Sequence, residues 1–525
     1  MRLMPRKRHR QRRRRRTQHG THLTPLLISF DDCRIFSSKC PLRQQDDYSQ
    51  SGAGLRPGLD LPEDIYRHIH ALMPLRDAAR AACVSHTFLQ SWRCFCNLIL
   101  SKETLVLNGN GISKDKMTRD LISKVDGILK NHSGVGMKKL ELNLHTCRKV
   151  DHCYLNSWLR IAVTAGIEEL TMLLPHISEV EYNFPCSLLF SGNEKSIGYL
   201  KLSSCVFRPT AELDCWRRLK ELSLINVLIT RDELECLLSN SSMLELLWLS
   251  RCNEIVRVKI PCQLQRLSFL RVGQCIELQE IESNAPNIST FDISGSNLVK
   301  ISFGSALQVN NMRIMCSYQP NIIWYTRTKH MPSVPNVETL HISSCNEMIS
   351  TPTLPSEFLH LKYLHITLIG CEAISPAYDY LSLVSFLVAS PCLETFIFEV
   401  QQTNMKHDSI VGDTSHQRQL PEHCHDNLKS VTIVGFCSAK SLVELTLHII
   451  KNASSLQCLT LDTSFGSYGC SVDKPGRCNP MGRYIIKEAH RALLAIRTHV
   501  EGIIPSRVKL NVSGPCSRCH AAERD

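Results

Sequence analysis

The chain has 525 residues, which is too many for one ordinary hydrophobic core, so two or more units or a repeat array are expected. Its composition, 43% hydrophobic and 21% charged, is that of a folded protein rather than a disordered one. The formal net charge of +12 is concentrated at the N-terminus, where ten arginines and lysines and no acidic residue occur in the first 16 positions. The rest of the chain is therefore close to neutral.

No apolar run approaches the roughly 18–20 residues that a membrane-spanning helix needs. The longest, LSLVSFLVAS, is followed directly by Pro391, and TPLLISF is too short for a secretory signal. We therefore expect a soluble, intracellular protein without membrane contact. In that compartment the 25 cysteines would be mostly reduced thiols rather than a disulfide framework.

Residues 1–20 form a basic tail, and residues 21–58 are predicted to be a linker. Like charges repel within RKRHRQRRRRR, which contains nothing apolar, so the tail is not expected to fold. The run is typical of a nuclear-import signal or of an arm that binds phosphates nonspecifically, and a plain solvated terminus is the third interpretation. It is too dense in arginine for the amphipathic face of a transit peptide.

Three short amphipathic helices are predicted between residues 61 and 93. Pro62 suits a first helical turn, Pro74 begins a second helix, and Ser85 can cap a third. Their apolar stripes are Ile65, Ile69 and Leu72 in the first helix, Leu75, Ala78, Ala79 and Ala82 in the second, and Phe88, Leu89 and Trp92 in the third. Helices this short bury little surface alone, so the excess apolar surface implies a partner, either elsewhere in the chain or in another protein.

The stretch LPEDI…LMPLRDAARAACVS…F…W resembles an F-box, whose pattern is Leu-Pro-acidic-x-Ile, a spaced Ile and Leu, Val-Ser and an aromatic residue. The resemblance assigns residues 59–100 to an F-box and implies binding to a Skp-type adaptor, which connects it to a cullin scaffold and a RING ubiquitin ligase. The matching positions would be adaptor-binding or structural: Leu61, Pro62, Ile65, Ile69, Leu75, Val84, Ser85 and Trp92.

Three positions depart mildly from the F-box pattern, because Ala78 and Ala79 replace larger aliphatic residues and Phe88 replaces a tryptophan-like residue. A plain three-helix cap on the following domain is the alternative interpretation. The histidines of this segment are expected on the solvent side of the helices rather than as ligands: His68, His70 and His86.

From Met137 onward a pattern of apolar, two residues, apolar, one residue, apolar recurs every 21 to 35 residues. Its middle anchors are Leu140, Leu170, Leu200, Leu222, Leu247, Leu270, Phe291, Met312, Leu340, Leu364, Phe396, Val431 and Leu459. This spacing predicts leucine-rich repeats over residues 101–465, in which short strands stack into a curved parallel sheet with a continuous core. The predicted fold class is therefore α/β, a leucine-rich-repeat solenoid preceded by the small three-helix F-box.

Four cysteines follow the pattern at a fixed distance, three residues after its last apolar position: Cys205, Cys252, Cys275 and Cys345. They resemble the turn of cysteine-containing leucine-rich repeats, in which the cysteine is a small buried hydrophobe at the strand exit.

The residue between each apolar pair of a repeat is expected on the concave face of the sheet. In chain order, the first of these residues are Glu141, Lys201 and Ser223. The set contains both acidic and basic side chains, whereas a groove that binds phosphates is mainly basic. The candidates for substrate binding are Trp248, Arg271, Asp292, Arg313, His341 and His365. Tryptophan and arginine are over-represented in binding hot spots, which makes Trp248 the first choice, with packing against a neighbouring repeat as the alternative.

From about residue 390 the sequence resembles the FBD-type region of plant F-box proteins with leucine-rich repeats. A strand ending at Phe436, a helix containing Leu442 and Ile449, and a strand around Leu459 are predicted there. Residues 466–525 are predicted to form a C-terminal cap, with a helix in KEAHRALLAIRTHV and a closing strand in VKLNV, followed by a cysteine-containing tail.

Little in the sequence indicates catalysis. CSRCH, Cys516 to His520, fits the c-type haem pattern, but it lacks an apolar pocket and an oxidising compartment. A zinc site joining Cys516, Cys519 and His520 with Cys470 or Cys478 has irregular spacing, and an accidental cysteine-rich loop is the default. We find no Ser-His-Asp order, phosphate-binding loop or dinucleotide fingerprint, and we expect no cofactor and no metal.

Taken together, the resemblance implies a non-catalytic subunit of a Skp-cullin-F-box ubiquitin ligase that binds an unidentified target protein. Its partners would be the Skp-type adaptor and the cullin scaffold, without membrane and without a nucleic-acid requirement, in the nucleus and/or cytoplasm. Two other classes stay open: a nuclear leucine-rich scaffold that binds protein or nucleic acid, and a metal or redox protein built on the C-terminal cysteines.

Overall fold

The computed structural model divides the chain into two units, Met1–Arg56 and Pro57–Asp525. It describes residues of the second unit only: 62–107, 113–133, 136–164, 166–176, 182–190, 197–209, 214–304, 308–316, 319–330, 334–352, 357–370, 378–401, 407–412, 416–418, 420–421, 423–464 and 481–516. The predictions for the basic tail and the linker lie outside these residues.

Three helices open the described part of the chain, where the sequence predicts them. They are α1 (Glu63–Leu72), α2 (Leu75–Val84) and α3 (His86–Arg93). Proline stands directly before α1 and before α2, and the Ser85 hydroxyl caps α3 by accepting a hydrogen bond from the Phe88 amide at 3.4 Å. Helices α1 and α2 both pack against α3.

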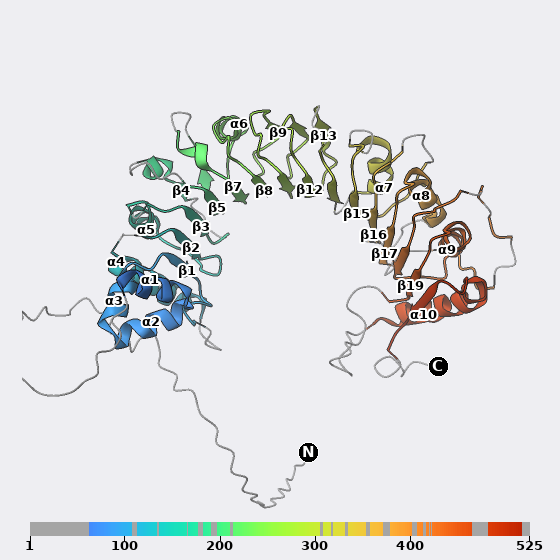
Figure 1. The fold of residues 1–525 in the computed structure, drawn as a ribbon, viewed down its shortest axis with the longest axis horizontal. Helices are drawn as coiled ribbons and strands as arrows, with labels where there is room; N and C mark the ends of the chain where they lie inside the picture. Colours follow the sequence, from blue (N-terminus) through green and yellow to red (C-terminus); the bar gives the residue numbers. More distant parts are fainter. Residues whose placement is uncertain are drawn as a thin grey trace, which may run out of the picture. The chain divides into compact units, whose positions relative to one another are not determined.

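A single parallel sheet follows, with fifteen strands among the described residues (Figure 1). In spatial order these are β1 (Asn97–Leu100), β2 (Lys139–Asn143), β3 (Glu169–Leu173), β5 (Tyr199–Ser203), β7 (Glu221–Ile225), β8 (Leu246–Ser250), β10 (Phe269–Gly273), β12 (Thr290–Gly295), β14 (Asn311–Cys316), β15 (Thr339–Cys345), β16 (Tyr363–Ile369), β17 (Thr395–Gln401), β18 (Ser430–Val434), β19 (Cys458–Asp462) and β20 (Lys509–Ser513). The predicted α/β leucine-rich-repeat solenoid is confirmed.

The register of the sheet follows the predicted repeat. All thirteen anchors, from Leu140 to Leu459, lie in one row of paired positions, and each is at most 2% exposed. The row extends to Leu98 of β1 and to Leu510 of β20. The sheet therefore starts inside the segment predicted as F-box and closes with the strand predicted in the C-terminal cap.

A second layer covers the other face of this sheet (Figure 1). Where anchors are far apart, the connections form helices: α4 (Lys114–Asn131), α5 (His152–Thr164), α6 (Arg231–Ser239), α7 (Ile322–Tyr325), α8 (Val384–Ala389), α9 (Lys440–Asn452) and α10 (Arg483–Ala495). The short repeats between Leu247 and Met312 instead form a second parallel sheet of β9 (Arg257–Ile260), β11 (Glu280–Ser283) and β13 (Lys300–Phe303). An extended chain crosses this layer in fewer residues than a helix needs.

The outer layer also contains a two-stranded ladder, β4 (Asn183–Phe184) and β6 (Val206–Phe207). Short helical turns complete it: η3 (Cys186–Phe190), η4 (Asp214–Arg218), η5 (Thr326–His330), η7 (Tyr380–Leu383), η9 (Ile496–Val500) and η10 (Glu501–Ile503). The core lies between the two layers and is filled by the anchors and by large side chains such as Trp158 and Phe207.

The four repeat cysteines are buried where the strands leave the sheet, as predicted, at 0–8% exposure. In three of these turns the residue before the cysteine adopts positive φ: Ser204 at 57°, Arg251 at 55° and Gln274 at 56°. This left-handed residue reverses the chain and directs the following cysteine into the core.

Candidate partner-binding surfaces

The helical unit leaves several apolar side chains uncovered. Pro62 is exposed, Ile65 is 40% exposed, and Leu72 and Val84 are 74% and 86% exposed. Ile69 is half-buried, and Leu61 lies outside the described residues. Exposed large aliphatic side chains on so small a unit are typical of a surface that another polypeptide covers.

Other predicted adaptor-binding positions hold the unit together. Leu75 and Trp92 are buried within this chain, and Ser85 is occupied as the helix cap. The sequence left adaptor-binding and structural roles open for these matching positions. Burial assigns Leu75 and Trp92 to the structural role. Leu72, which was not among the predicted adaptor-binding residues, is among the exposed ones.

His70 contradicts the expectation of a solvent-side histidine. It is fully buried, its Nε2 lies 2.7 Å from the Ala78 carbonyl oxygen, and its ring contacts Phe88 and Phe95 edge-on. Burial lowers the pKa of this imidazole, and the hydrogen bond to Ala78 opposes the shift. Because α1 turns the His70 side inward, Ile65 and Leu72 remain uncovered.

The predicted concave residues form one row across the long sheet. Lys201, Ser223, Trp248, Arg271, Asp292, Arg313, His341 and His365 are paired in sequence from strand to strand. Glu141 belongs to the same row, two strands before Lys201. The strands thus bring together all the predicted substrate-binding residues, and their binding role stays a prediction.

Trp248 lies between two cations. The Lys201 Nζ is 5.4 Å and the Arg271 guanidinium carbon is 5.0 Å from the centroid of the indole ring. Both distances are within reach of a cation–π contact. The half-buried indole therefore packs against neighbouring repeats, which was the alternative for this residue, while keeping part of its surface accessible.

Asp292 is the least accessible of the predicted substrate-binding residues, at 6% exposure. One carboxylate oxygen lies 3.4 Å from Arg271 Nε, and the other has no hydrogen-bond partner among the described residues. Burial raises the pKa of this carboxyl group, and Arg271 and Arg313 oppose the shift. Asp292 is therefore poorly placed to contact a partner directly. Its ion pair with Arg271 instead holds the arginine side chain in its orientation.

Two histidines continue the row. The rings of His341 and His365 stack with centroids 4.0 Å apart, and His365 Nε2 lies 3.4 Å from Glu399 Oε1. Burial, together with His365 and Arg313, lowers the pKa of His341 to about 4, so it is neutral at pH 7. Glu399 was not among the predicted residues, because it lies two positions beyond the row on β17.

The row of predicted residues therefore combines Trp248, alternating basic and acidic groups and a stacked pair of histidines. Such a mixture suits the surface of another protein better than the regularly spaced phosphates of a nucleic acid.

The predicted haem motif and terminal zinc ligands lie outside the described residues, except for Cys516. Among the helices that the structure describes, none has both the length and the apolar character for a membrane span.

Comparison with known proteins separates the chain into two matched regions. Residues 59–100 match the F-box domain, and residues 128–517 match the family described as the At1g61320/AtMIF1 LRR domain. The chain belongs to the F-box proteins with leucine-rich repeats. The second match covers most of its length and includes the region that resembles the FBD type.

Relatives from Arabidopsis thaliana are named as F-box proteins, with an FBD region, leucine-rich repeats or both. The F-box/FBD/LRR-repeat protein At1g13570 is 27% identical over 79% of this chain and 92% of its own length. The FBD-associated F-box protein At5g56370 is 26% identical over 45% of this chain and 53% of its own. The putative F-box/FBD/LRR-repeat protein At4g03220 is 26% identical over 46% and 52%. Proteins with an F-box followed by leucine-rich repeats are typically non-catalytic adaptors, which is the general role that this organisation supports.

Proposed function

We propose that this F-box protein is the substrate-recognition subunit of a Skp-cullin-F-box ubiquitin ligase. The F-box binds a Skp-type adaptor through Pro62, Ile65, Leu72 and Val84, and the inner face of the sheet binds a target protein. The exposure of Ile65, Leu72 and Val84 on a matched F-box domain supports this assignment most directly.

In this role the chain breaks no bond. The adaptor and cullin hold the ubiquitin-transferring enzyme, and the repeats hold the target beside it. Tethering raises the effective concentration of the target's lysines at the transfer site, which accelerates a step that other subunits catalyse.

The proposed location is the nucleus and/or the cytoplasm, where ubiquitin ligases of this class act. The N-terminal arginines would serve as the signal for import into the nucleus. No cofactor is part of the proposed mechanism.

The test replaces exposed aliphatic residues of the F-box with aspartate. For Ile65→Asp combined with Val84→Asp, binding to a purified Skp-type adaptor should fall more than about 100-fold, because buried carboxylates at an apolar interface cost several kcal/mol. Both side chains are exposed in the chain alone, so the fold should persist. Calorimetry or surface plasmon resonance measures the affinity, and circular dichroism the fold.

A matched control is Ile276→Asp, which changes an exposed aliphatic residue of the repeat domain and should leave adaptor binding unchanged. Unchanged affinity of the F-box double variant, or no binding by the parent chain, would remove the ligase assignment and favour the leucine-rich scaffold instead.

A further inference from the structure

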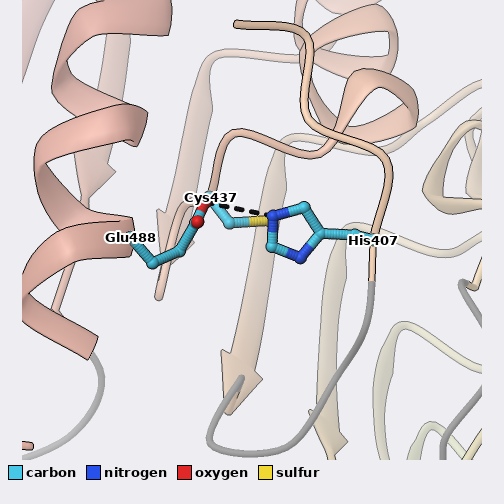
Figure 2. A group of neighbouring side chains, drawn as sticks. All are labelled: His407, Cys437 and Glu488. Carbon is cyan, nitrogen blue, oxygen red and sulfur yellow. Dashed lines mark hydrogen bonds and ion pairs between the residues drawn. The ribbon is translucent and has the colours of Figure 1, made fainter. Parts of the chain in front are cut away.

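Three side chains with metal-binding chemistry meet inside the C-terminal part of the repeat domain (Figure 2). His407 lies in the segment before β18, Cys437 in the connection between β18 and α9, and Glu488 on α10. Their ligand atoms all lie within 4.8 Å of one another, and His407 Nε2 is 3.1 Å from Glu488 Oε1. Segments distant in sequence thus place an imidazole, a thiol and a carboxylate around one point.

This cluster is shielded from water. Cys437 is fully buried, and the side chains of His407 and Glu488 are only 6% and 7% exposed. Glu488 Oε1 accepts a hydrogen bond from the Ser438 amide at 2.8 Å and lies 3.1 Å from His407 Nε2. A buried carboxylate needs a compensating positive charge, and Arg491, whose Nη1 lies 3.8 Å from Glu488 Oε2, supplies part of it from the rim of the cluster.

An imidazolium at His407 would compensate poorly. Its Nδ1 is buried and has no hydrogen-bond partner among the described residues, so a charged N–H would be left unsatisfied. In the neutral imidazole one ring nitrogen carries no proton, and when the proton is on Nδ1 the Nε2 lone pair is free to bind a cation between Glu488 and Cys437.

We propose that His407 Nε2, Cys437 Sγ and a Glu488 carboxylate oxygen bind one Zn²⁺ ion. Zinc bonds of about 2.0–2.3 Å in a tetrahedron separate the ligand atoms by roughly 3.3–3.8 Å. In this cluster the imidazole and carboxylate atoms are 3.1 Å apart and all three ligand atoms lie within 4.8 Å, so small shifts would bring them to that geometry. Thiolate and imidazole favour zinc over magnesium or calcium. The thiolate and the carboxylate together balance the two charges of the ion, and binding releases the thiol proton to solvent.

The surroundings of the cluster support its ligands. The Ser438 amide donates to Glu488 Oε1 at 2.8 Å and fixes the carboxylate. The Ser438 hydroxyl lies 3.4 Å from His407 Nε2 and 2.7 Å from the Ser409 hydroxyl, so two serine hydroxyl groups line the cluster beside its three ligands. Because Cys437 is buried, the role is structural: the ion ties α10 to the β18–α9 connection and holds the end of the solenoid closed.

The experiment measures zinc by mass spectrometry in the full chain after dialysis against metal-free buffer. About one zinc per chain is expected for the parent protein, and less than about a fifth of that for Cys437→Ser and for His407→Gln. Two controls should keep the metal: Cys345→Ser, another buried cysteine, and the double variant Cys516→Ser with Cys519→Ser, which removes ligands from the alternative terminal site.

Substitution with Co²⁺ gives a second measurement on the parent chain that does not depend on whether a variant folds. A thiolate-to-cobalt absorption band that appears in the parent chain and reaches its limit at about one Co²⁺ per chain supports the site. The proposal is overturned if the parent chain holds no stoichiometric metal, if Cys437→Ser retains it, or if only the terminal double variant loses it. None of these outcomes involves the F-box, so the ligase assignment is tested separately.

Discussion

Single side chains on the inner face of the sheet are held mainly by one another. Arg271 contacts the Trp248 ring on one side and the Asp292 carboxylate on the other, so its rotamer is fixed before any partner arrives. A pre-ordered arginine loses less conformational entropy on binding than a free one. These contacts make Arg271 and Trp248 suitable recognition residues, with Asp292 as their support.

A histidine on the same face should make the stability of the fold depend on pH. His341 has a folded-state pKa of about 4, whereas an unfolded histidine has 6.5, so unfolding takes up a proton between these values. Stability should therefore be complete above about pH 6.5 and fall as the pH drops toward 4. Each such histidine contributes at most about 1.4 kcal/mol per pH unit. His425, whose pKa burial and the neighbouring histidines also lower to about 4, acts in the same direction.

His341→Gln should flatten this dependence, as measured by urea unfolding between about pH 5 and 7. The exposed His68→Gln is the control and should leave the slope unchanged. An equal slope in the parent chain and in His341→Gln would show that His341 does not titrate with unfolding.

At the scale of elements, the turns after the inner strands are the most constrained parts of each repeat. Gln274 is exposed yet adopts φ of 56°, because the chain must reverse there to bury Cys275. A β-branched side chain is strongly disfavoured in this conformation.

Gln274→Val should therefore lower the free energy of unfolding by about 1–2 kcal/mol. Gln279→Val changes another exposed glutamine, one without positive φ, and should alter stability by less than about 0.5 kcal/mol. Chemical denaturation of both variants measures the difference. Equal effects would mean that the left-handed turn carries no special cost.

The sequence pattern was sufficient for the inner strands from β2 to β19, because each needs the same three apolar positions and only one register buries them all. It did not predict β1, which lies within the segment assigned to the F-box. It did not predict β9, β11 and β13, since their alternation is short and resembles a polar loop. The inward turn of His70 was also missed, because helical periodicity marks apolar residues and a buried histidine interrupts that stripe. The cluster of His407, Cys437 and Glu488 has no local spacing at all and appears only when β18, α9 and α10 pack.

At the scale of the whole repeat domain, each strand depends on its neighbours, and the last strand must be protected. Strand β20 pairs with β19 in parallel, and α10 packs beside this end through buried residues such as Ala489 and Ala492. Terminal repeats of solenoids need such a cover, because an open edge and an uncovered core lead to association.

A chain that ends at Ser464 lacks α10 and β20 and should aggregate. A chain that ends at Gly514 keeps both and should remain monodisperse to the same extent as the full-length protein. Size-exclusion chromatography with light scattering distinguishes the two. A monodisperse protein ending at Ser464 would show that the closing strand is dispensable.

The strands β9, β11 and β13 have a geometric consequence for partner choice. Neighbouring strands are spaced by about 4.8 Å in either layer, whereas packed helices need 8–10 Å. A repeat array with helices in its outer layer must therefore curve, whereas one with strands in both layers has equal spacing on the two sides and should curve little. Trp248, Arg271, Asp292 and Arg313 lie on β8, β10, β12 and β14, the inner strands of this section. We therefore expect these side chains to lie on a flatter stretch of the sheet than those of strands backed by helices, which favours a flat patch or an extended segment of a target over a strongly convex surface.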